Sequence, residues 1–270
     1  MTDDFGQSDP AALLAAYDAQ LRGVAEVQGA VNWDHVGPLW RALFTDGAFV
    51  SYESLEELGT VEEVDRLIAD TVAHFAAIPQ VKEFEWKTRG HDWPPDLDRQ
   101  LRAHGLEPEE VETVMVGEAT RLAVDVELPS GVVVRRVDHL PDREALITEA
   151  SEVAARIFGD GPSGAEMLAR LDRMEGREQF WVAEADGHVV CSGRLAMVEG
   201  TEFAGIWGGS TLPEWRGKGI YRALTAARAR AALAEGVRYI QSDSTPMSRP
   251  ILERSGLVAV TTTTPYIWKR

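Results

Sequence analysis

The chain has 270 residues, 44% of them hydrophobic and 26% charged, a composition that is typical of folded globular proteins and excludes a disordered chain. The N-terminus is acidic and polar, unlike a signal peptide, and no apolar run is long enough to span a membrane, so we expect a cytoplasmic protein without membrane contacts. The single cysteine, Cys191, excludes an intrachain disulfide, and the six histidines show no metal-binding spacing, so we predict no metal site.

Nearly all of the net charge of −17 lies in the first half of the chain. Residues 1–125 hold nine Lys and Arg against 25 Asp and Glu, whereas residues 126–270 hold 18 against 19. An acidic surface repels phosphate backbones and attracts cations, so we expect no nucleic-acid partner. Two interpretations of the acid excess stay open: it keeps the protein soluble, or it steers a cationic substrate toward its site.

The first half is predicted to contain a long helix from Val61, a strand, a short helix that ends at Gly105, and another strand. A Pro-Ser-Gly sequence within residues 126–136 then marks a domain boundary, because the charge balance changes there and a β-branched run follows.

The second half is predicted to alternate between strands and helices and to form an α/β fold with a mixed sheet. In chain order, the predicted elements are a strand at 132–137, helices at 142–158 and 164–174, strands on both sides of the hairpin turn 186–187, a strand at 202–212 with a bulge at 208–209, a helix that ends at 235, a strand at 237–244, a helix at 248–256 and a strand at 261–268.

The strand at 202–212 and the long helix are joined by a turn with the sequence RGKG, from Arg216 to Gly219. Backbone N–H groups at a helix N-terminus bind phosphate, and glycines let the phosphate approach closely. The turn is not a P-loop, because Gly219 stands where that motif needs Ser or Thr, and Arg222 breaks the dinucleotide-binding fingerprint. By itself, the turn predicts either a phosphate site or only a tight start of a helix.

Residues 131–270 resemble the GNAT superfamily of acetyl-CoA-dependent N-acetyltransferases over their whole length. Arg216 and Gly219 match the family's pyrophosphate signature, Gln/Arg-x-x-Gly-x-Gly/Ala, whereas Tyr221 departs from it at the last position. The segment before the closing strand is similar to the family's segment that ends in Gly-Phe, with Leu257 in place of the phenylalanine. The resemblance implies a GNAT fold and acetyl-CoA as the acyl donor.

The resemblance also implies where acetyl-CoA binds. Gly209, Ser210 and Thr211 are expected to pair with the pantetheine arm as an added strand, and the N–H of Leu212 to stabilise the oxyanion that forms when an amine attacks the thioester. The pyrophosphate is expected to bind the turn and the first helical residues, namely Arg216, Gly217, Lys218, Gly219, Ile220, Tyr221 and Arg222. The ring of Tyr221 must then point away from the phosphate.

For proton transfer, the resemblance implies no complete set of residues. Many GNAT enzymes protonate the departing thiolate with a tyrosine four residues before the glycine of the Gly-Phe pair, but Leu252 stands at that position. Ser248, Tyr221, Tyr266 and water are the alternatives. Glu202 is the carboxylate nearest in sequence to the expected thioester and is the candidate base, with water again as the alternative.

The first half repeats the element order of the second: its short helix ends at Gly105-Leu106, as the later one ends at Gly256-Leu257. Residues 52–64 precede its long helix and are acidic, without the glycine and arginine signature. We therefore predict tandem GNAT-like units, a degenerate acidic domain at 1–125 that does not bind CoA and an acetyltransferase domain at 131–270. A chance coincidence of two common α/β patterns is the alternative.

The predicted function is the transfer of an acetyl group from acetyl-CoA to the primary amine of a small cationic molecule, by direct attack on the thioester. The presence of Leu252 and Tyr221 at their signature positions favours one alternative, a non-catalytic acyl-CoA-binding or regulatory protein. Another alternative is an acyltransferase that uses a longer acyl chain or a protein amino group. The fold alone does not decide among them.

Overall fold

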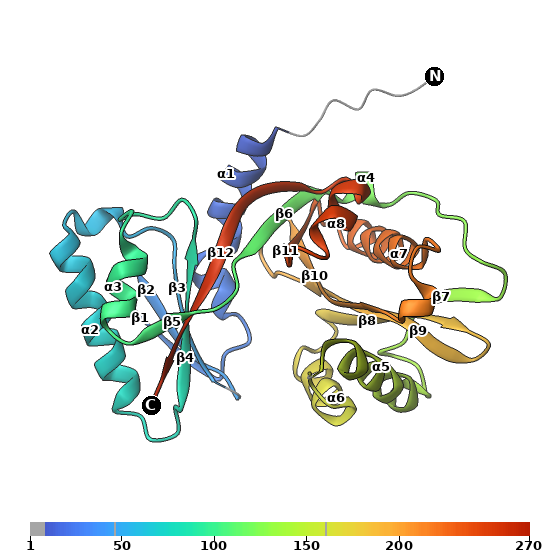
Figure 1. Cartoon of the computed structure of the whole chain (residues 1–270), viewed down its shortest axis with the longest axis horizontal. Helices are drawn as coiled ribbons and strands as arrows, with labels where there is room; N and C mark the ends of the chain where they lie inside the picture. Colours follow the sequence, from blue (N-terminus) through green and yellow to red (C-terminus); the bar gives the residue numbers. More distant parts are fainter. Residues whose placement is uncertain (1–8, 46, 160) are drawn as a thin grey trace. The chain divides into compact units, whose positions relative to one another are not determined.

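The computed structural model describes residues 9–45, 47–159 and 161–270, so the N-terminal stretch 1–8 that argued against a signal peptide lies outside the described residues. The chain divides into two compact units (Figure 1). The first unit comprises residues 9–115, 243–249 and 259–270, and the second comprises residues 116–242 and 250–258. Across the described ranges, no helix is both long and apolar enough to cross a membrane.

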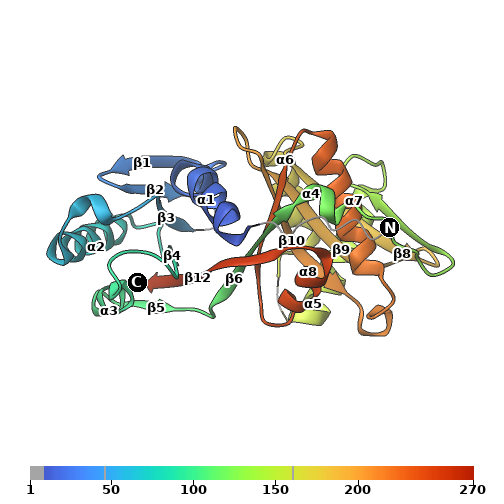
Figure 2. The ribbon, with the colours of Figure 1, turned by 90° about the horizontal axis from the view of Figure 1, so that it is seen from above.

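The first unit is a mixed sheet with helical segments on both faces. Its strand order is β1-β2-β3-β4-β12, with β5 paired to β12, and its pairs are antiparallel except for β3 and β4. Figures 1 and 2 show α2 and α3 on one side of these strands and α1 on the other. The elements are α1 (Pro10–Leu21), η1 (Gly23–Val27), β1 (Asn32–Val36), β2 (Leu39–Leu43), β3 (Ala48–Tyr52), η2 (Glu56–Leu58), α2 (Val61–Ala76), β4 (Glu83–Arg89), α3 (Leu97–Ala103), β5 (Leu106–Pro108) and β12 (Val258–Lys269).

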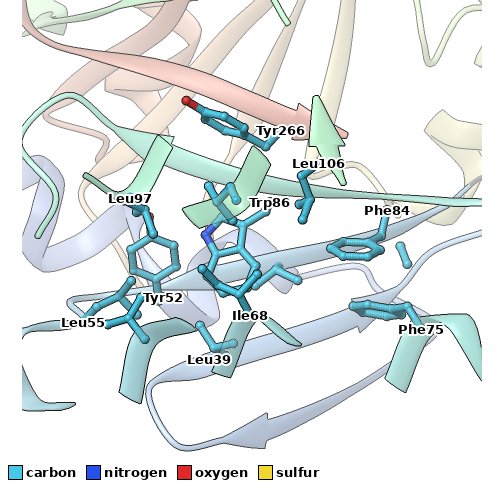
Figure 3. Packing of buried hydrophobic residues seen from close by; sticks show 14 of the residues in the cluster. Leu39, Tyr52, Leu55, Ile68, Phe75, Phe84, Trp86, Leu97, Leu106 and Tyr266 are labelled. Atoms are coloured by element: carbon cyan, nitrogen blue, oxygen red, sulfur yellow. The ribbon is translucent and has the colours of Figure 1, made fainter. Parts of the chain in front are cut away.

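Strand β4 separates an apolar face of the first unit from a polar one. Phe84 and Trp86 point into the hydrophobic core formed with α2 and α3 (Figure 3). Lys87 and Arg89 point the other way, where Nη2 of Arg89 donates to Oε1 of Glu26 over 2.6 Å. Since successive strand residues face opposite sides of a sheet, one strand borders both the core and a buried ionic network.

The second unit has the strand order β6-β11-β10-β9-β8-β7. Strands β10 and β11 are parallel, and β7 to β10 form an antiparallel meander. Helices α5 and α6 cover one face of the sheet and α7 covers the other (Figure 1). All elements predicted for residues 131–270 are present. The second unit contains β6 (Glu112–Glu118) from residue 116 onward, β11 (Tyr239–Ser244) up to residue 242 and α8 (Arg249–Ser255) from residue 250 onward. Its other elements are α4 (Ala119–Leu122), β7 (Val132–Arg136), α5 (Arg143–Phe158), α6 (Gly164–Arg173), β8 (Glu178–Ala185), β9 (His188–Met197), β10 (Phe203–Thr211), η3 (Pro213–Trp215) and α7 (Ile220–Ala234).

The compact units differ in composition from the predicted segments 1–125 and 131–270. Residues 259–270 belong to the first unit, because β12 pairs with β4 from Thr263 to Lys269. Residues 116–125 belong to the second unit, where the N–H of Ala119 donates to the carbonyl of Arg238 over 2.8 Å. Hydrogen-bonded pairing, rather than chain order, decides which residues pack together. The division of the sequence into domains at 1–125 and 131–270 stays a prediction.

Phe75 of α2 is fully buried in the core of the first unit. We expect Phe75→Ala to lower the free energy of unfolding by about 3–5 kcal/mol, because it removes a buried ring and leaves a cavity. Denaturant titration followed by circular dichroism measures this loss. Phe158→Ala is the matched control, because Phe158 is 52% exposed at the end of α5, and it should cost less than about 1 kcal/mol. Equal losses in both variants would contradict this packing of α2.

Candidate functional site

Strand β10 is interrupted by a bulge at Gly208 and Gly209. Trp207 pairs with Arg194 of β9 and Ser210 pairs with Ser192, so the two glycines together face the single residue between those partners. On its other edge, β10 is in register with β11 only from Phe203 to Gly205. The predicted bulge is therefore present, and it lies beside a strand edge on which an extended ligand can add as a further strand.

After β10, the chain passes through η3 and a turn that contains two left-handed glycines. Gly217 has a φ of +74°, and Gly219, the N-cap of α7, has a φ of +78°. Residues with a Cβ rarely adopt this left-handed backbone conformation. A Cβ on Gly217 would meet no atom within 4 Å, so the turn faces open space at this residue, whereas a Cβ on Gly219 would lie 3.5 Å from Cγ1 of Val126. Ile220 is 1% exposed and anchors the first turn of α7 in the core.

The start of α7 presents a run of unpaired backbone amides. Among the described residues, the backbone N–H groups of residues 217–222 have no hydrogen-bond acceptor. The first N–H group of the helix with an acceptor is that of Ala223, which donates to the carbonyl of Gly219 over 2.9 Å. No side chain caps this helix. Unpaired amides at the positive end of a helix dipole bind phosphate, so this turn fits the pyrophosphate of acetyl-CoA.

Cationic side chains surround the same turn. Arg216, Lys218 and Arg222 are exposed. Nε of Arg216 donates to the carbonyl of Thr211 over 3.1 Å, and Nζ of Lys218 lies 4.4 Å from the ring centroid of Trp215. Both cations are thus held beside the amides, where they add to the positive potential that attracts phosphate.

Tyr221 packs its ring against the bulge. A Cβ on Gly209 would lie 2.5 Å from Cε2 of Tyr221 and 2.8 Å from its hydroxyl oxygen, so only glycine leaves room for the ring. The ring also contacts the core cluster that includes Ile220 and Leu224. It therefore points away from the phosphate turn, as the resemblance requires, while the N–H of Tyr221 stays at the start of α7.

The corresponding helix of the first unit, α2, has a different N-terminus. The hydroxyl of Thr60 accepts the N–H of Glu63 and donates to its carboxylate over 2.8 Å. Two acidic residues, Glu62 and Glu63, occupy the first turn. Because the cap already bonds one amide and the carboxylates repel anions, α2 does not offer a phosphate site.

The structure does not bring two predicted residues to the reacting position. The N–H of Leu212 donates to the carbonyl of Val190 over 3.0 Å, so it is not available to an oxyanion. Glu202 precedes the opposite end of β10, roughly 20 Å from Gly208 at about 3.3 Å per strand residue. Two residues that are close in sequence lie far apart in space when the chain between them is an extended strand.

The alternatives for the acid belong to different compact units. In the first unit, the hydroxyl of Tyr266 donates to Asp98 over 2.6 Å, and burial together with this bond raises the pKa of Tyr266 above its ordinary value. The Ser248 hydroxyl, also in the first unit, donates to the carbonyl of Thr245. Leu252 is 1% exposed in the second unit. Of these alternatives, Tyr221 is the one that lies at the bulge.

A buried cation of the second unit, Arg228, was not among the site residues predicted from the sequence. It lies on α7 and is fully buried. The signal was its spacing: Ile220, Leu224 and Arg228 follow one another at intervals of four residues, which places Arg228 on the apolar face of the helix.

Residues 147–254 match a protein-family model described as the acetyltransferase (GNAT) family. This match confirms the predicted GNAT acetyltransferase domain in the second half of the chain, and with it the prediction of an acyltransferase. A search of curated protein sequences gave no significant match.

Solved structures resemble the chain over nearly its whole length. A tandem GNAT protein from the clavulanic acid biosynthesis pathway is 14% identical with a TM-score of 0.65, over 98% of this chain and 97% of that one. A GCN5-related N-acetyltransferase from Kribbella flavida is 17% identical with a TM-score of 0.57, over 90% and 93% of the two chains. Another from Sphaerobacter thermophilus is 19% identical with a TM-score of 0.58, over 86% and 76%. These likenesses show the fold, and they confirm the predicted tandem GNAT architecture.

Gly219 tests the phosphate turn. We expect Gly219→Val to weaken acetyl-CoA binding at least tenfold by calorimetry, because a β-branched residue does not adopt a φ of +78° and the amides lose their alignment. Gly236→Val is the matched control: Gly236 follows α7 with a φ of +82° and is strained equally, but it is remote from the amides. If both variants bind acetyl-CoA as the unmodified protein does, the turn is not the phosphate site.

Cys191 is expected to be unreactive in the folded protein. Burial raises the pKa of its thiol to about 11, so the thiolate is scarce at pH 8. A thiol reagent at pH 8 should label Cys191 only after denaturant is added, and labelling in the native state should increase as the pH approaches 11. Rapid labelling of the native protein at pH 8 would contradict this burial.

Proposed function

We propose that this chain, which carries an acetyltransferase domain of the GNAT family over residues 147–254, transfers the acetyl group of acetyl-CoA to the primary amine of a small cationic molecule. One observation carries the proposal: the unpaired amides at the start of α7 follow directly after the bulge and the open edge of β10. A nucleotide pyrophosphate and an extended pantetheine arm need these two features in this order.

The residues divide the binding of acetyl-CoA between them. The amides of residues 217–222 and the side chains of Lys218 and Arg222 would hold the pyrophosphate. The backbone of residues 209–211 would pair with the pantetheine amides. The side chains of Ser210 and Thr211 bond instead to β9, at 2.9 Å from Oγ of Ser192 and 3.2 Å from Sγ of Cys191, so they hold the strand in place.

The bulge amides would supply the electrostatic part of the reaction. The amine loses its proton to water, its nitrogen attacks the carbonyl carbon of the thioester, and the C=O electron pair moves to oxygen. The N–H groups of Gly208 and Gly209, which lie in the bulge opposite Gly193, would stabilise this oxyanion, because donors that are already aligned in a strand act without reorganisation. The electron pair on oxygen then re-forms the C=O bond as the C–S bond breaks, the pair of that bond leaves on sulfur, and the nitrogen loses its second proton to water.

The preference for a cationic acceptor rests on the charge of the first half of the chain. Residues 1–125 carry 25 acidic residues against nine basic ones, and such a surface raises the local concentration of cations. The competing function, an acyl-CoA-binding protein without turnover, is favoured by the buried Leu252 at the position of the usual acid.

Calorimetric titration with acetyl-CoA, followed by a thiol-release assay over a polyamine, an aminoglycoside, an amino-acid amide and a neutral amine, tests this function. We expect one binding site per chain, turnover on a cationic amine, and a kcat/KM for that amine that falls as salt increases, because salt screens surface charge. Binding without turnover would support the competing function. An equal salt dependence for cationic and neutral amines would rule out steering by the acidic half.

A further inference from the structure

Arg228 is a fully buried guanidinium that bonds to uncharged oxygens alone. Its three donors reach the carbonyl of Leu224 over 3.3 Å, the carbonyl of Arg194 over 3.0 Å and the hydroxyl of Thr225 over 3.2 Å. Within the part of the chain that the structure describes, no carboxylate lies at ion-pair distance from it. Removing a charge from water costs several kcal/mol unless a partner offsets it, and such groups concentrate at functional sites.

The position of Arg228 is directly behind the bulge. Nη1 lies 2.6 Å from the place that a Cβ would take on Gly193, so the absence of a side chain there makes room for the guanidinium. Gly193 is the residue of β9 that faces the bulge 208–209, since its two neighbours pair with Trp207 and Ser210. Arg228 thus approaches the bulge from the face of the sheet that α7 covers.

A second guanidinium approaches the bulge from the other face. Arg194 follows Gly193 in β9, so its side chain points to the opposite side of the sheet. Its Nε lies 3.3 Å from the Cβ position of Gly208. Its Nη1 bonds to Glu178 over 2.6 Å, but Glu178 also accepts a bond of 2.7 Å from Arg170. The buried carboxylate of Glu178 therefore pairs with two guanidinium groups, those of Arg194 and Arg170. With Arg228, three positive charges stand against this one negative charge.

Resting on the acetyl transfer proposed above, we infer that Arg228 and Arg194 are positioning residues whose charges stabilise the negative charge that forms first on the thioester oxygen and then on the departing sulfur. The C–N bond forms as the C=O pair moves to oxygen, and the C–S bond breaks as its pair moves to sulfur. Sulfur leaves as a thiolate and takes its proton from water. No proton donor is then needed at Leu252.

Tyr221 is the competing explanation. Its hydroxyl lies at the bulge, and the Arg228 guanidinium lies 5.8 Å from its ring centroid. If Tyr221 protonates the thiolate, the charge of Arg228 acts through that phenol instead. The two explanations differ in the state of the sulfur, because only the first stabilises a thiolate in the bound product.

The experiment measures the pKa of the CoA thiol bound to the full chain, by the ultraviolet absorbance of the thiolate as the pH rises. We expect the pKa of the bound thiol to lie about one unit or more below that of free CoA, because a nearby cation favours the anion. In Arg228→Gln, this pKa should move back toward the value of free CoA by at least half of that difference. Arg228→Lys, which keeps the charge, should retain most of the shift. Arg230→Gln is the matched control, since Arg230 is exposed on the same helix and pairs with the exposed Asp125. Cys191 does not interfere, because its pKa is about 11.

Turnover supplies the second readout. We expect Arg228→Gln to lower kcat about tenfold to a hundredfold at an unchanged affinity for acetyl-CoA, and to lose less with the acetyl selenoester, whose leaving group is a weaker base. Tyr221→Phe should keep the pH dependence of kcat. Three results would each overturn the inference. The bound thiol could titrate like free CoA, Arg228→Gln and Arg228→Lys could have equal effects, or Tyr221→Phe could lose the change in kcat at alkaline pH. Failure of the unmodified protein to bind CoA would overturn the proposed function, and this inference with it.

Discussion

The bulge in β10 is the constraint on which the site of the second unit depends. Two glycines opposite one residue of β9 break the register, and they do so where the pairing with β11 has already ended. Beyond Gly205, the edge of β10 that faces β11 therefore has no register partner within the sheet, and it can pair with an extended ligand. The same glycines admit the side chains that pack on them, since Gly209 leaves space for Tyr221 and Gly208 lies against Arg194.

Helix α7 connects the glycine turn at its N-terminus with the bulge in β10. Its N-terminus offers unpaired amides to the solvent, and its apolar face carries Arg228 to the back of the bulge. A helix with a buried arginine and no carboxylate partner is destabilised, and three neutral acceptors offset part of that cost. Retaining a positive charge behind the bulge is consistent with chemistry that creates negative charge in front of it.

The two units show how little sequence change separates a helix start with unpaired amides from a capped one. Both place a long helix after a strand, but α7 begins at a left-handed glycine without a side-chain cap, whereas α2 begins at Thr60 with a carboxylate three residues later. In the first unit, the polar face of the sheet is used for an internal ionic network around Arg89 and Glu26 instead.

The sequence by itself determined the element order of the second unit, the bulge, the glycine turn before α7 and the GNAT acetyltransferase domain, because each of these depends on residues that are neighbours in the chain. Periodicity and glycine positions are local signals, so they survive without knowledge of packing. Only the tertiary structure decided that the N–H of Leu212 is used by Val190, that Glu202 lies at the far end of β10, and that Arg228 reaches the bulge. It also decided that the last strand completes the sheet of the first unit, beside β4. Hydrogen-bond pairing and burial join residues that are distant in sequence, and no local pattern specifies those partners.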